Sequence, residues 1–103
     1  MKIDEFQRLI EDIYYKRDSE RGLGGTFMWF VEEVGELSTA LRERDKGDGG
    51  NKKELEAEFA DCLAWLMTLA SISGVRMEDA IAKYTSGCPR CKGTPCRCPQ
   101  TKP

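Results

Sequence analysis

The sequence predicts an all-α fold. Apolar residues recur every three or four positions in long segments, and no segment alternates with the period of two that is typical of a strand. Glycine-rich stretches separate these segments, and all four prolines lie beyond residue 86. The 103 residues suit one small domain. We therefore expect a helical domain over residues 1–85 and a short cysteine-rich tail over residues 86–103.

Four helices are expected in order. The first covers residues 3–17, where apolar residues recur every three or four positions with charged residues between them. Residues 18–25 then form a glycine-rich break. Thr26 is a candidate cap for a second helix that ends near Asp45, before a turn over residues 46–50. A third helix begins at residue 51 or 52 and stops at residues 73–74, and a short fourth covers residues 77–84.

The second and third helices each carry an apolar stripe, which needs cover within the chain or in an oligomer. On the second helix the stripe is Phe27, Phe30, Val34, Leu37 and Leu41. On the third helix it consists of Leu55, Phe59, Cys62, Leu63, Leu66, Leu69 and Ala70.

The sequence contains no histidine, which excludes Ser-His and Cys-His nucleophilic sites. Any metal must then be held by carboxylates, which suit hard cations such as magnesium, or by thiolates, which suit zinc.

Charge is distributed unevenly along the chain. All 18 acids lie between Asp4 and Asp79, and 11 of the 16 bases lie at or before Arg76, so the chain up to Asp79 has a net charge of −7. From Lys83 onward there are five bases and no acid, which gives +5. An acidic body argues against a nucleic-acid-binding surface. The chain has no run of about 20 apolar residues and no apolar export signal near Met1, so we expect a cytoplasmic protein that does not enter a membrane.

Acidic residues of the second and third helices are in register. In an antiparallel hairpin centred near Gly47, facing residues have numbers that add to about 94. Glu33 faces Asp61 and Glu36 faces Glu58 under this rule. Four carboxylates without an interleaved base repel one another unless a cation binds among them, and oxygen ligands suit Mg²⁺ or Mn²⁺. The alternative is that these acids form an ordinary solvated helix face.

Two tryptophans obey the same rule. Trp29 and Trp65 face each other one turn from the acids, so they can form the aromatic walls of a nucleotide pocket. They can equally belong to the core or to a dimer interface.

The tail holds four thiols within 11 residues, at Cys88, Cys91, Cys96 and Cys98. This C-x-x-C and C-x-C spacing favours a structural, tetrahedral zinc site, with disulfides or an unmetallated flexible tail as alternatives. Cys62 stands apart and is expected to be a buried apolar residue.

The acid motif also resembles a known family. Glu32-Glu33-Val34-Gly35-Glu36, followed after 21 residues by Glu58-Phe59-Ala60-Asp61, is similar to the E-E-x-x-E and E-x-x-D signature of MazG-like nucleotide pyrophosphohydrolases. The resemblance covers residues 3–84, and it implies a four-helix MazG-like bundle that hydrolyses a nucleoside triphosphate to the monophosphate and pyrophosphate with magnesium.

The resemblance also implies residue roles. It makes Glu33, Glu36, Glu58 and Asp61 the Mg²⁺ ligands, with Glu32 and Glu33 catalytic and Glu32 orienting or deprotonating the water. Lys83 and Tyr84 stand where relatives contact the nucleotide, although Tyr84 can instead cap the core. A homodimer or homotetramer is implied as well.

Two non-catalytic interpretations remain open at this point. The chain can be a helical scaffold whose zinc-binding tail binds a protein or nucleic-acid partner, which the +5 tail would suit. It can also be a purely structural bundle.

Overall fold

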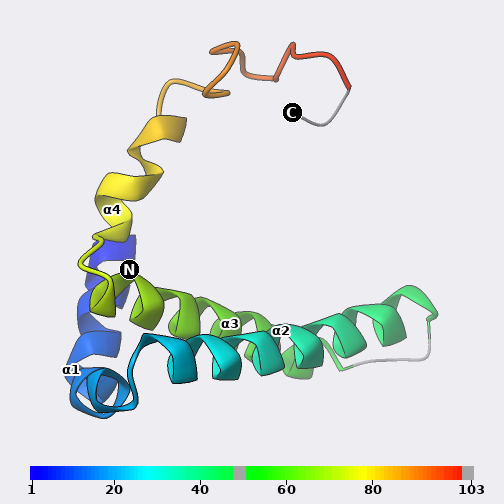
Figure 1. The fold of residues 1–103 in the computed structure, drawn as a ribbon. Coiled ribbons are helices and arrows are strands. Elements are labelled where there is room, and N and C mark those ends of the chain that lie inside the picture. The colour runs from blue at the N-terminus through cyan, green and yellow to red at the C-terminus, as the bar shows by residue number, and fades with distance from the viewer. Residues whose placement is uncertain (48–50, 101–103) are drawn as a thin grey trace.

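A computed structural model describes residues 1–47 and 51–100. It consists of helices α1 (Ile3–Arg21), α2 (Leu23–Asp45), α3 (Lys52–Ile72) and α4 (Met77–Ala80), followed by the 3₁₀ helix η1 (Ile81–Tyr84). Helices α2 and α3 form an antiparallel hairpin, and α1 packs across the end of it that is far from their connection (Figure 1). No strand occurs in the described ranges. The all-α prediction is confirmed.

The break between α1 and α2 is much shorter than the eight residues we predicted. Only Gly22 lies between the two helices, with a φ of 86°, and α1 continues through the polar residues up to Arg21. Asp18 is buried there because it has partners: its carboxylate accepts a hydrogen bond from Arg21 at 2.9 Å, and its carbonyl accepts one from the Gly22 N–H at 3.0 Å. These bonds let a polar segment stay helical.

Thr26 is not a helix cap, contrary to the prediction. It lies inside α2, fully buried, and its hydroxyl donates to the Asp18 carbonyl at 3.5 Å. A Cβ at position 25 would lie 2.9 Å from the Cγ of Arg21, so glycine there leaves room for the Arg21 side chain. Gly25 thus makes room for a side chain of α1, whereas Gly22 is the residue at which α1 ends.

The predicted limits of α3 are confirmed. Asn51 caps its first turn by accepting a hydrogen bond from the Lys53 N–H at 2.8 Å, and the helix ends just before Ser73 and Gly74, where Gly74 has a φ of 75°. Of the predicted turn before α3, Lys46 and Gly47 form a turn, and residues 48–50 lie outside the described residues.

Gln7 and Arg76 fix the start of α4. The buried Gln7 amide donates to the Val75 carbonyl at 2.9 Å and to the Ser71 hydroxyl at 3.0 Å, and it accepts from the Met77 N–H at 2.8 Å. Arg76 pairs with Asp4 at 2.7 Å and with Glu11 at 2.6 Å. The predicted fourth helix is therefore present, but only its first half is α-helical and its second half is η1.

The core is small and only partly matches the predicted stripes. Ile10, Met67 and Ala70 are its buried apolar residues. Many stripe residues are exposed instead, as in Phe27 and Phe59, which are 53% and 52% exposed. These stripes are left uncovered in the protomer because the hairpin turns its acidic sides, as the predicted register requires, toward the space between its two helices.

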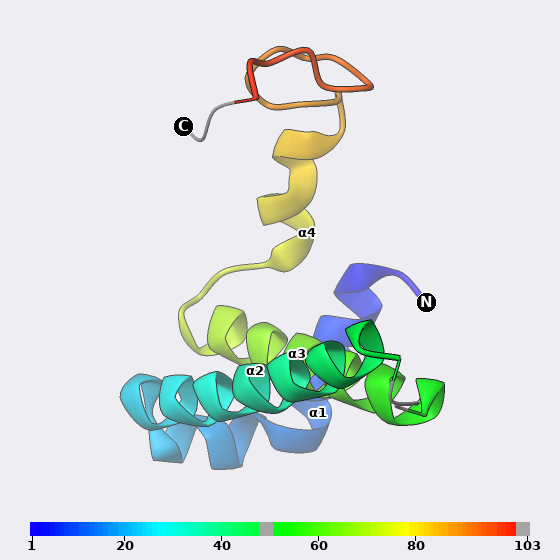
Figure 2. The same cartoon turned by 90° about the vertical axis from the view of Figure 1, so that its right-hand side faces the viewer.

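Helix α4 and η1 project away from the hairpin, and the chain beyond η1 forms an irregular loop (Figure 2). Across the described helices, none alone is long and apolar enough to span a membrane, although α3 and the Met77–Tyr84 segment, bent by 98°, pass that test as a pair on length and composition.

Candidate functional site

The register predicted for the hairpin is confirmed by its two tryptophans. Trp29 of α2 and Trp65 of α3 stack with their ring centroids 6.0 Å apart and an angle of 24° between the planes. Since facing positions of the hairpin share this register, the acids one turn further along each helix face one another as well.

Three of the four predicted acidic ligands converge. Glu33, Glu36 and Glu58 each place a carboxylate oxygen within 4.8 Å of the others. Asp61 lies outside this group of three, yet it is close enough for its charge to raise the pKa of Glu33. Glu32 is exposed on α2 and is not a member of the group either.

Burial and mutual repulsion disfavour the charged forms of Glu33 and Glu58. Burial raises the pKa of Glu33 and of Glu58 above the ordinary value, and the neighbouring charges of Glu36 and Asp61 raise both further. The Oε2 atoms of Glu33 and Glu58 are buried without a hydrogen-bond partner among the described residues. Unpartnered carboxylate oxygens within a group of converging acids fit a hard divalent cation, so the donor set suits Mg²⁺ or Mn²⁺.

A cavity of about 320 Å³ adjoins the acids at the junction of α1 with the hairpin. Asp61 links the two, since it belongs to the cavity wall as well. The complete wall consists of Tyr14, Arg17, Asp18, Arg21, Trp29, Asp61, Ala64, Trp65 and Thr68. The two tryptophans line the cavity as predicted, but because they stack on each other they form one continuous aromatic wall and not two opposed ones.

Arg21 is a cavity residue that sequence reasoning missed. Its guanidinium lies 5.7 Å from the Trp29 ring centroid and 5.3 Å from that of Trp65, and it is held there by Asp18. The Asp18 carboxylate in turn accepts a hydrogen bond from the Thr68 hydroxyl of α3 at 3.0 Å. The spacing of Asp18 and Arg21 is that of a helical ion pair, which was the available signal, but these residues were assigned to a break.

Lys83 and Tyr84 lie apart from the cavity. Both are on η1, where the Lys83 ammonium lies 5.3 Å from the Tyr84 ring centroid and Tyr84 is 60% exposed. Neither contributes to the wall of the cavity in the protomer. Tyr84 therefore does not cap the core, and contact of these residues with a substrate stays a prediction.

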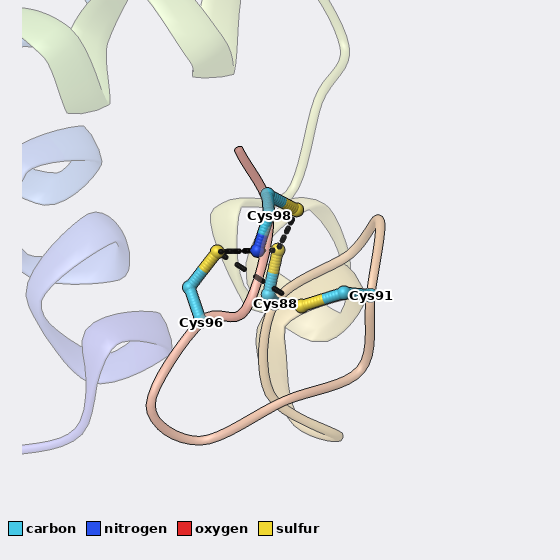
Figure 3. A group of neighbouring side chains, drawn as sticks. All are labelled: Cys88, Cys91, Cys96 and Cys98. Carbon is cyan, nitrogen blue, oxygen red and sulfur yellow. Dashed lines mark hydrogen bonds between the residues drawn. The ribbon is translucent and has the colours of Figure 1, made fainter. Parts of the chain in front are cut away.

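The four tail cysteines form a second group (Figure 3). The sulfur atoms of Cys88, Cys91, Cys96 and Cys98 all lie within 4.8 Å of one another, and none is in a disulfide. This arrangement can hold a metal ion. Cys62 is on α3, away from the group and half-buried, and burial raises its thiol pKa.

Backbone amides polarise the tail thiols. Hydrogen bonds from the N–H groups of Arg97 and Gly93 lower the pKa of Cys91 to about 6, and backbone hydrogen bonds also lower the pKa of Cys88. The sulfurs around Cys98 raise its pKa to about 12. Because amide donors stabilise the charged form, the loop favours thiolates at some of its four positions before any ion is bound.

A comparison with curated proteins gave no match. The model of the MazG nucleotide pyrophosphohydrolase domain, in contrast, matches residues 24–92. The match includes both helices of the hairpin with all the converging acids, as well as α4 and η1. Since it covers more than half of the chain, this protein belongs to the MazG nucleotide pyrophosphohydrolase domain family.

Proposed function

We propose that this chain is a Mg²⁺- or Mn²⁺-dependent pyrophosphohydrolase that converts a ribo- or deoxyribonucleoside triphosphate to its monophosphate and pyrophosphate. The observation that carries the proposal is the pair of buried, unpartnered carboxylate oxygens on Glu33 and Glu58, two acids that converge from opposite helices of the hairpin in a MazG-family chain. The family acts on nucleotides and depends on a divalent metal, so the acid cluster is the natural place for that ion.

In this proposal Glu33, Glu36, Glu58 and Asp61 hold the ion. When bound, it neutralises charge on the phosphates and orients the scissile bond. Glu32, exposed beside the cluster, accepts a proton from the attacking water. The water oxygen then bonds to the α-phosphorus as the bond from that phosphorus to the bridging oxygen breaks, and pyrophosphate leaves. No covalent enzyme intermediate is required.

The cavity next to the cluster supports a nucleotide in particular. Its aromatic wall offers Trp29 and Trp65 to a base, and the Arg21 guanidinium offers positive charge to an anionic group. We include Lys83 and Tyr84 among the substrate contacts, since an exposed lysine beside an aromatic ring suits phosphate and base.

We further propose that the chain works as a homodimer or homotetramer. The outward-facing apolar residues of the hairpin support this, because a single protomer leaves side chains such as Phe27, Phe59 and Leu63 in solvent. We also propose a cytoplasmic location, where thiols stay reduced and can serve as metal ligands.

The test is a panel of ribo- and deoxyribonucleoside triphosphates with Mg²⁺ or Mn²⁺, with pyrophosphate and nucleoside monophosphate both measured. At least one nucleotide should be turned over. Glu33→Gln and Asp61→Asn should each lower kcat by about 100-fold or more. Glu56→Gln is the matched control, because Glu56 is an exposed acid of α3 outside the cluster and its loss should leave the rate unchanged.

No turnover of any nucleotide with either metal would overturn the proposal. Equal loss of activity in the Glu56→Gln control would overturn the assignment of the cluster. The first result would favour the non-catalytic scaffold.

A further inference from the structure

The four tail sulfurs have the spacing of a tetrahedron. The distance from Cys88 Sγ to Cys96 Sγ is 3.6 Å, that from Cys88 Sγ to Cys98 Sγ is 3.7 Å, and that from Cys91 Sγ to Cys96 Sγ is 3.9 Å (Figure 3). With Zn–S bonds of about 2.3 Å, a regular tetrahedron of sulfur ligands has edges of about 3.8 Å. The distances are thus those between ligands of one ion.

The tail loop has no apolar core of its own. Among the described residues from Thr85 to Gln100, only Gly93 is buried, and no α-helix or strand is formed. A segment that buries so little apolar surface needs a cross-link or a metal to hold one conformation. The four clustered sulfur atoms are the groups around which the loop is folded.

The backbone is shaped closely around the sulfurs. The N–H groups of Gly93 and Arg97 donate to Cys91 Sγ at 3.4 and 3.2 Å, and the Cys98 N–H donates to Cys96 Sγ at 3.3 Å. Such outer hydrogen bonds orient thiolate ligands and offset their charge.

Gly87 is a glycine that allows this loop to close. Gly87 has a φ of 97°, and a Cβ on it would lie 2.7 Å from Thr94 Oγ1 and 2.8 Å from the Lys92 carbonyl oxygen. The loop is also closed by two backbone bonds, from Cys88 N–H to the Gly93 carbonyl at 3.0 Å and from Lys92 N–H to the Cys88 carbonyl at 2.7 Å. Gly87 is therefore a position where a side chain would disturb the thiols without removing one.

From these observations we infer that residues 87–98 form a closed, structural zinc site in which Cys88, Cys91, Cys96 and Cys98 are the four ligands. Four protein ligands leave no open position for water or substrate, so the ion holds the loop and does not take part in hydrolysis. Binding exchanges the thiol protons for Zn²⁺ and needs no oxidant. The exposed side chains of Arg90, Lys92 and Arg97 offset the net charge of −2 of such a centre.

The inference is independent of the proposed hydrolysis, and the full-length protein tests it. After loading with ZnCl₂ and gel filtration, we expect one zinc per chain by elemental analysis. Co²⁺ in its place should give the visible absorption of a tetrahedral thiolate complex. Each of the four Cys→Ser changes in the tail should lower zinc affinity by more than about 100-fold, since loss of an outer hydrogen bond alone costs 10–100-fold.

Two variants act as controls, and a third tests the shape of the loop. Cys62→Ser removes the one cysteine outside the tail and should keep one zinc. Glu33→Gln should keep it too, which separates this site from the acid cluster. Gly87→Ala retains all four thiols and should still weaken binding.

Several results would overturn the inference. They are a loaded wild-type protein without zinc, zinc that remains in the tail Cys→Ser variants, or a mass lower by two hydrogens for each disulfide in the protein as isolated.

Discussion

The indole rings of Trp29 and Trp65 stack on each other across the α2–α3 hairpin, 6.0 Å apart between centroids. This contact joins the two helices that carry the acid cluster, one turn away from it. The stacked pair therefore sets the register in which Glu33, Glu36 and Glu58 meet.

We expect the two tryptophans to be energetically coupled. In a double-mutant cycle of Trp29→Leu and Trp65→Leu, the coupling in the free energy of unfolding should be about 1 kcal/mol, as is usual for an aromatic pair. Urea denaturation followed by circular dichroism measures it. Phe27→Leu combined with Trp65→Leu should be additive, and coupling of equal size in that pair would contradict the assignment.

The buried hydrogen bond between Thr68 and Asp18 should contribute strongly to stability. Thr68→Val keeps the shape but removes the donor to the Asp18 carboxylate, which should cost about 2 kcal/mol of unfolding free energy. The control is Thr39→Val, because Thr39 is exposed and bonds only its own helix at Gly35. Its unfolding free energy should change by less than about 0.5 kcal/mol. Similar losses in the two variants would contradict this role.

The acid cluster should make the metal-free protein less stable as the pH rises. Glu33 and Glu58 have raised pKa values in the folded state, so folding favours their protonated forms. The unfolding free energy should then fall from pH 4.5, the ordinary value for Glu, up through the raised pKa. Thermal unfolding in EDTA at a series of pH values measures this slope.

A change in the cluster should reduce the slope. Glu58→Gln removes one of the titrating groups and should flatten it, whereas Glu56→Gln should not. Mg²⁺ at 100 times its Kd should stabilise the protein by about 2.7 kcal/mol above pH 7. A slope of opposite sign would contradict the crowding of these carboxylates.

Gln7 should be required for the attachment of α4. Gln7→Leu leaves the Met77 N–H and the Val75 carbonyl without their partner, at a cost of about 3 kcal/mol in unfolding free energy. Amide exchange at Met77 should also become faster. Gln100→Leu, at an exposed tail position, is the control and should change neither quantity.

Helical spacing and hairpin arithmetic were enough to predict the facing of Glu36 with Glu58 and of Trp29 with Trp65. Both depend only on the helix period and on the position of the turn, which are local properties. The gathering of the four tail cysteines was predictable for the same reason, since their spacing is short.

What failed depends on contacts distant in sequence. Asp18 stays helical and buried only because Thr68, 50 residues away, donates to it, and Arg21 reaches the tryptophans only because α1 crosses the hairpin. The amphipathic pattern also does not state whether an apolar stripe is covered by its own chain or by another copy, and Phe27 and Phe59 stay exposed in the single protomer.

The backbone conformation at Gly22 determines which enantiomer of an amino acid position 22 would accept. Its φ of 86° belongs to the left-handed region, yet apart from the two neighbouring residues no atom lies within 4 Å of where a Cβ would be. Only the handedness of an L-amino acid opposes a substitution there. A D-alanine introduced at position 22 by chemical synthesis would be accommodated, whereas L-alanine would turn the last residues of α1, and Arg21 with them, away from the indole rings.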